Sequence, residues 1–114
     1  MSEQKPIYPV INQHWGEQRK KLAPKTSEAF KAFSRSVFAD GAISVKTKQL
    51  IAVAVAHATR CPHCIIGHTN GAIRDGATPE EIMEAIWVAV EMCAGAAYAH
   101  SGLALEAISR SRNL

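Results

Sequence analysis

Residues 78–93 read TPEEIMEAIWVAVEMC, and this stretch decides the fold class. Thr78 is a predicted N-cap, Pro79 suits the first helical position, and Glu81 completes a capping box. The helix over residues 82–93 is apolar on nearly every side, so every side needs a covering surface. Because one chain of 114 residues has little interior, we predict a homo-oligomer. The alternative is a tight monomeric bundle with this helix at its centre.

The rest of the chain also carries helical patterns. Further predicted helices cover residues 13–22, 26–38, 46–59, 61–75 and 96–111. Ser44 is a plausible N-cap and Gly76 a helix-ending C′ residue. Residues 1–12 read as an extended arm, and no segment alternates with period two as a strand would. The prediction is an all-α fold of about five to six helices in a single domain, residues 1–114.

The amino-acid composition argues against several classes of protein. The chain has 13 Lys and Arg against 10 Asp and Glu, a net charge of +3 that does not by itself imply a nucleic acid partner. The longest apolar stretches are about a dozen residues, too short for a membrane span. Its first residues lack a secretory pattern, and three cysteines, an odd number, argue against a disulfide-stapled secreted domain. We expect a soluble, cytoplasmic protein.

The chemistry is concentrated in residues 61–68, which read CPHCIIGH. Residues three apart in a helix have Cα atoms about 5 Å apart, within the range for a disulfide. Cys61 and Cys64 can therefore open and close a bond without large backbone movement. His68 follows Cys64 by four residues, which puts both on one face of the helix, one turn apart.

This segment begins a helix, because Pro62 suits the first helical position and Cys61 the N-cap. The free N–H groups and the positive dipole end favour a thiolate there, and thiols in such sites have pKa values of roughly 3.5–7.5. Two sulfurs and an imidazole that accepts protons make a redox centre. Such a centre can reduce a peroxide through a sulfenic acid that condenses with the second thiol.

A zinc site is the competing interpretation, since Cys61, Cys64 and His68 are three suitable ligands. A structural zinc site needs a fourth ligand, for which the candidates are His63, His57, Cys93 and His100. Cys93 and His100 belong to different predicted helices, and Cys93 is expected to be a small apolar core residue. A third possibility is that the cysteines are buried and unreactive.

Four segments resemble one known family. They are residues 46–56 (KTKQLIAVAVA), 61–64 (CPHC), 68–72 (HTNGA) and 76–82 (GATPEEI). Together they are similar to the carboxymuconolactone decarboxylase and alkylhydroperoxidase D superfamily, in its branch with a Cys-x-x-Cys pair. The similarity covers about residues 24–109, which we take as the family core, with residues 1–23 as an N-terminal arm and short helix.

The resemblance implies an all-α oligomer, often a trimer or hexamer, with thiol peroxidase activity and no cofactor. It implies that Cys64 is the peroxidatic sulfur, Cys61 its thiol partner, His68 part of a proton relay, and His63 a minor helper. The implied partners are a small hydroperoxide and a dithiol or dihydrolipoyl-type reductant. The helix dipole alone would favour Cys61 as the thiolate, because it lies nearer the helix end.

One position departs from the family pattern. The branch has a Glu twelve residues before the first cysteine, acting as a base through His and water, and this chain has Gln49 there. An amide cannot accept that proton, but it also removes a charge that would oppose the thiolate. We therefore expect a readily ionised thiol and modest peroxidase turnover. The alternatives are a decarboxylase or lactone-handling enzyme of the same fold, or a non-catalytic zinc-binding or assembly protein.

Overall fold

The computed structural model describes residues 13–112, and in that range the protein has five helices and no strand. They are α1 (Gln13–Leu22), α2 (Pro24–Val37), α3 (Val45–Thr59), α4 (Pro62–Arg74) and α5 (Pro79–Ser111). The all-α prediction is confirmed, and the number of helices falls in the predicted range. The extended arm expected over residues 1–12 lies outside the described residues.

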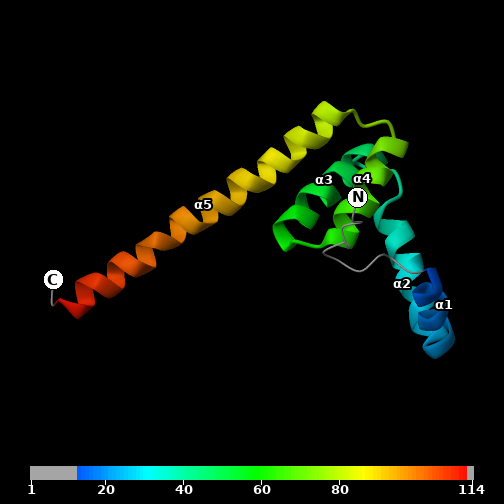
Figure 1. Ribbon diagram of the computed structural model, residues 1–114, viewed down its shortest axis with the longest axis horizontal. Coiled ribbons are helices and arrows are strands. Elements are labelled where there is room, and N and C mark those ends of the chain that lie inside the picture. Colours follow the sequence, from blue (N-terminus) through cyan, green and yellow to red (C-terminus); the bar gives the residue numbers. More distant parts are fainter. Residues whose placement is uncertain (1–12, 113–114) are drawn as a thin grey trace, which may run out of the picture.

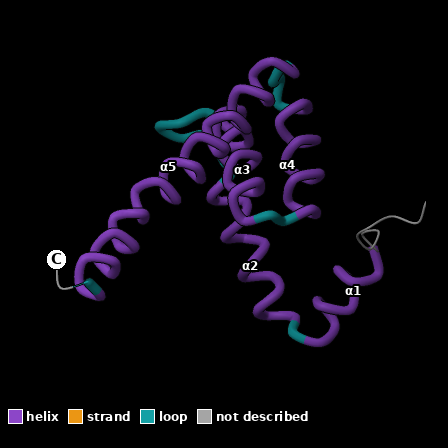
Figure 2. Tube along the Cα trace, turned by 60° about the vertical axis from the view of Figure 1, so that its left-hand side comes forward, coloured by secondary structure: helices purple, strands orange, loops and turns teal. Residues whose placement is uncertain are grey.

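The centre of the molecule is formed by α3, α4 and the first part of α5. Figures 1 and 2 show α3 and α4 side by side, with α5 leading away from them. Their shared core is small: Val53, Ala72, Ala77 and Ile82 are buried, and Leu50 and Ile86 pack against them. The residues that carry the predicted chemistry lie on the two central helices, α3 and α4.

Each helix of this body begins at a predicted cap. The Ser44 hydroxyl accepts from the Thr47 amide at 3.2 Å, and Thr78 and Glu81 form the predicted capping box. Cys61 is the N-cap of α4. Gly76 follows the end of α4 with φ +95°, a left-handed conformation that glycine adopts freely. These four local predictions are confirmed.

The separate helices expected over 82–93 and 96–111 are one continuous helix, α5, of 33 residues. Gly95 does not break it, because a glycine costs only about 1 kcal/mol in a helix and its flanks are alanine-rich. Cys93 is exposed, so its placement in the core was wrong. The expectation that no apolar stretch is long enough to span a membrane was also wrong, because by length and composition alone the 33-residue α5 could cross one.

The first two helices form a hairpin beside this body (Figure 2). Lys48, near the start of α3, ties down the end of α2: its ammonium donates to the carbonyls of Val37 and Ala39, at 2.8 and 2.6 Å. This anchor fixes the chain between α2 and α3, and with it the position of Phe38, which faces the site described next.

Candidate functional site

The two cysteines of the CPHC segment lie together at the start of α4. Cys61 and Cys64 form a disulfide, and their Cα atoms are 5.2 Å apart, in agreement with the spacing expected from helix geometry. The bond closes over the first turn of the helix, with Pro62 at the first helical position. The predicted pairing is therefore compatible with an undistorted helix start.

The two sulfurs have different surroundings. The Cys61 sulfur is the cap of α4 and accepts a hydrogen bond from the Cys64 amide at 3.3 Å. Cys61 is half-buried, whereas Cys64 is exposed. A negative charge is thus better stabilised on Cys61, while Cys64 is the more accessible sulfur.

His68 lies one turn after Cys64 on α4 and is held from α3 by Gln49. The His68 Nδ1 is 2.8 Å from the Gln49 Oε1. With the amide oriented this way, Nδ1–H donates to the oxygen, and Nε2 keeps the lone pair that can accept a proton. Gln49 is only 9% exposed, so the interaction is sheltered from water. The structure brings these two predicted site residues into direct contact.

Gly71, one turn before the end of α4, makes room for this amide. A Cβ atom at Gly71 would lie 2.9 Å from the Gln49 carboxamide carbon and oxygen, closer than packing allows. A side chain at position 71 would therefore push Gln49 away from His68. Sequence reasoning did not single out Gly71, because its role depends on a contact between two helices.

Phe38 covers the other side of the imidazole. Its ring stacks on the His68 ring with centroids 5.0 Å apart and planes inclined by 22°. Phe38 comes from the connection between α2 and α3, thirty residues away in the sequence, so no motif pointed to it. The contact restricts the orientation of His68 and adds an apolar wall to the site.

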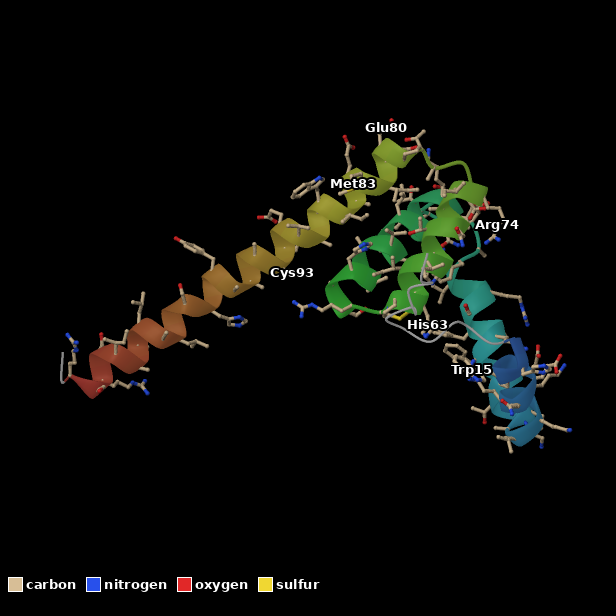
Figure 3. All side chains as sticks on the ribbon, viewed as in Figure 1. Trp15, His63, Arg74, Glu80, Met83 and Cys93 are labelled. Carbon is tan, nitrogen blue, oxygen red and sulfur yellow. A yellow bond between two sulfur atoms is a disulfide. The ribbon has the colours of Figure 1, made fainter. Side chains whose placement is uncertain are left out.

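His63 stands apart from the pair formed by Gln49 and His68. It is exposed and points toward α1, where its ring meets Trp15 edge-on at 6.4 Å (Figure 3). The N-terminal hairpin thus reaches the turn that carries the two cysteines.

The candidate zinc ligands are dispersed. His57 is half-buried and its Nδ1 is 2.8 Å from the Val53 carbonyl oxygen. Cys93 and His100 belong to the same helix, α5, rather than to two. Across residues 13–112, no group of three His, Cys, Asp or Glu side chains is arranged to hold a metal ion.

Comparison with known proteins matches this chain to one family. The sequence profile of the carboxymuconolactone decarboxylase family matches residues 24–107. The chain belongs to the carboxymuconolactone decarboxylase family. This family includes enzymes, and the Cys61–Cys64 pair is consistent with its Cys-x-x-Cys branch.

One relative is the uncharacterised protein 4 in the cox locus of Paracoccus denitrificans, which is 69% identical to this chain over 78 residues. That alignment covers 68% of this chain and 70% of the relative. A crystal structure of a carboxymuconolactone decarboxylase family protein from Legionella pneumophila is 35% identical, with a TM-score of 0.66, and covers 82% of this chain and 84% of that one.

A second solved family member comes from Thermotoga maritima, and a role in the antioxidative response has been suggested for it. It is 26% identical, with a TM-score of 0.56, and covers 79% of this chain and 97% of that one. One helix of this length and composition is only weak support for a membrane span, because core helices of soluble proteins can be equally long and apolar.

Proposed function

We propose that this protein is a thiol–disulfide oxidoreductase that reduces small hydroperoxides with electrons from a dithiol. The observation that carries the proposal is the Cys61–Cys64 disulfide at the start of α4, with an exposed Cys64 and an oriented imidazole one turn further on. The antioxidative role suggested for the Thermotoga maritima relative is in keeping with this chemistry.

The reductive half of the catalytic cycle begins at Cys64, the more accessible of the two sulfurs. A thiolate of a dithiol reductant, such as a dihydrolipoyl group, attacks Cys64, and the bond to Cys61 breaks. Cys61 leaves as a thiolate that the Cys64 amide and the helix end stabilise, which makes it a good leaving group. The second thiol of the reductant then attacks the mixed disulfide, releases Cys64 and closes the reductant's own disulfide.

The oxidative half uses the same accessible sulfur. The Cys64 thiolate attacks the terminal oxygen of a hydroperoxide, the O–O bond breaks, and an alcohol leaves after taking up one proton. Cys64 is then a sulfenic acid, and the Cys61 thiol condenses with it to restore the disulfide and release water. Over one cycle, one hydroperoxide and one dithiol give one alcohol, one water and one disulfide.

His68 is the group proposed to move protons in both halves, because its Nε2 is left as an acceptor by the bond from Nδ1 to Gln49. Gln49 is then a positioning residue, which fixes the imidazole but cannot take a proton itself. His63 is exposed beside the cysteines and is proposed as a minor helper. Because the Gln49 amide cannot act as a base, we propose a modest turnover of hydroperoxide.

We infer that the protein acts in the cytoplasm. Disulfides of cytoplasmic proteins are mostly transient and catalytic, because the compartment keeps thiols reduced. A pair that alternates between dithiol and disulfide matches that environment.

The decisive experiment is hydroperoxide consumption with a dithiol donor, comparing wild type with Cys64→Ser. We expect the variant to lose turnover, while Cys93→Ser, which removes the cysteine outside the pair, keeps it. Thiol counting should show reversible loss of two thiols per chain. Full hydroperoxide turnover in Cys64→Ser would refute the proposal. A catalytic activity that does not need either cysteine, and so survives in a Cys61→Ser, Cys64→Ser double variant, would point to a decarboxylase or lactone-handling enzyme. Stoichiometric zinc would point to a non-catalytic zinc-binding protein.

A further inference from the structure

One lysine ammonium of α3 holds the end of α2 on both sides of Phe38. The Lys48 Nζ donates to the carbonyl oxygens of Val37 and Ala39, at 2.8 and 2.6 Å. These two residues flank Phe38 in the chain. The Phe38 amide donates in turn to the Ser34 carbonyl at 3.0 Å. Three hydrogen bonds therefore fix the backbone of Phe38 and of its two neighbours.

The charge of Lys48 is committed to this anchor. Lys48 is half-buried, and in the part of the chain that the structure describes no carboxylate pairs with it. The last carbonyls of a helix form the negative end of its dipole, so an ammonium there makes charge-assisted hydrogen bonds, which are stronger than neutral ones. Lys46, the other lysine of α3, is paired instead with Glu81 at 2.8 Å. Lys46 thus links α3 to α5, and Lys48 links α3 to α2.

The side chain that this anchor holds is the one that touches the imidazole of the site. Phe38 stacks on His68, with ring centroids 5.0 Å apart and planes inclined by 22°. Phe38 is half-buried, whereas Phe30 and Phe33 of α2 are 68% and 64% exposed. Of the three Phe in the chain, the one beside the anchor is therefore the packed one.

Two consecutive residues of α3 thus hold His68 in different ways. The Gln49 Oε1 accepts from Nδ1 at 2.8 Å, and Lys48 acts on the face of the ring through Phe38. A hydrogen bond to one ring nitrogen still lets the imidazole swing about that bond, whereas a ring stacked on its face stops the swing. The two contacts together fix the plane of the imidazole, and with it the direction of the Nε2 lone pair.

We propose that Lys48 is a positioning residue of the redox site: it holds Phe38 against the His68 imidazole and so fixes the direction of Nε2. Lys48 transfers no proton itself, because its ammonium is bound to the two carbonyls at the end of α2. The effect of Lys48 on turnover rests on the proposed function, whereas its effect on the orientation of the imidazole does not.

The first test reads the imidazole directly and needs no activity. A phenyl ring stacked on the imidazole moves the signals of the imidazole ring protons upfield in the NMR spectrum, and His68→Gln assigns these signals. We expect Lys48→Met and Phe38→Leu to move them downfield alike, because both remove the stacked ring. Lys48→Arg should keep them in place, since a guanidinium can donate to both carbonyls. Signals that move in Phe38→Leu but not in Lys48→Met, or that move in neither, would overturn the proposal.

Lys46→Met is the matched control, because it removes the same charge from the same helix. It breaks the ion pair with Glu81 and leaves the anchor at the end of α2 intact. We expect it to lower the Tm but to leave the His68 signals and kcat at their wild-type values. Equal changes of signals and kcat in Lys46→Met and Lys48→Met would show that Lys48 serves stability alone, and would overturn the proposal.

The closing experiment measures hydroperoxide turnover of Lys48→Met in two backgrounds. In the wild-type background kcat should fall by as much as about 10²-fold with KM little changed, the loss that a small misplacement of a reacting group can cause. In the His68→Gln background the same substitution should not lower the residual turnover further, because a residue that acts only through His68 has no effect without it. An unchanged kcat in Lys48→Met, or an equal loss in both backgrounds, would overturn the proposal. A wild type without hydroperoxide turnover would refute the proposed function, and the NMR comparison would still decide whether Lys48 positions His68.

Discussion

At the scale of single residues, the site depends on the contact between Gln49 and His68. A distance of 2.8 Å and burial at 9% exposure mean that the amide acts as a fixed acceptor for the imidazole. A carboxylate of the same length would fit the same space beside Gly71 and would also stabilise the protonated imidazole. The difference between the two side chains is therefore electrostatic rather than steric.

Gln49→Glu tests whether the proton relay limits the proposed reaction. We expect peroxide turnover to rise, because the general base that the amide cannot supply is typically worth about 10²–10⁴-fold. The measurement is the initial rate of hydroperoxide consumption over a range of pH, with the dithiol in excess.

Gln49→Ala is the control for the role of Gln49 in holding the His68 imidazole in place. It removes the acceptor for Nδ1 and should lower the rate, because His68 is no longer held. An unchanged or lower rate in Gln49→Glu would show that proton transfer is not limiting, or that the new charge suppresses the thiolate.

Much of this residue-level picture could be predicted from sequence, because local geometry determines it. The cysteine spacing and the cap at Cys61 follow from one helix start, and both are observed. Phe38 could not be predicted, since its stacking on His68 depends on how Lys48 anchors the end of α2. The proximity of Gln49 to His68 was expected only from family resemblance, as the two residues lie on different helices.

At the scale of elements, most helix boundaries were predicted to within one or two residues, and the error was a division within α5. Thr78 and Glu81 define the start of α5 through side-chain contacts within one turn, which the sequence displays directly. The same helix continues past Cys93 because no strong breaker interrupts the alanine-rich stretch that follows. A division after Cys93 was expected, and the observed helix continues instead to Ser111.

The start of α5 is also tied to α3 by an ion pair. Lys46 donates to Glu81 at 2.8 Å, and this bond, with the Thr78 amide, holds the pKa of Glu81 below its ordinary value of 4.5. A depressed pKa gives stability that is present above the unfolded-state pKa and is lost as pH falls through the folded-state pKa. The ion pair should therefore act at neutral pH and fail in acid.

Glu81→Gln separates the charge from the cap, because glutamine can still accept from the Thr78 amide. We expect a lower Tm than wild type at neutral pH and a gap that closes as the pH falls below 4.5. Thermal unfolding followed by circular dichroism across this range provides the measurement. Glu80→Gln is the matched control, with the same charge removed from the same turn. An equal, pH-independent loss in both variants would refute a specific role for the Lys46 pair.

At the scale of the whole molecule, the single chain buries little of its apolar surface. Within residues 13–112, only Val53 among the larger side chains is fully buried, and Trp87, Tyr98 and Leu103 are more than 60% exposed. The sequence indicated this indirectly, through a helix that is apolar on most sides. It could not show which surface would cover that helix, because this depends on how separate helices pack together.

If a second copy completes the core, stability must depend on protein concentration. Association favours the folded state by mass action, so a hundredfold increase in concentration should raise the Tm of a dimer of this size by about 5 °C. Calorimetry or circular dichroism at a low and a hundredfold higher concentration measures the shift. A Leu105→Glu/Ile108→Glu variant, which places two charges on the exposed apolar side of α5, should unfold at a Tm that does not change with concentration. A wild-type Tm that is equally constant would mean that the chain is stable without a partner, and that the uncovered face of α5 has another role.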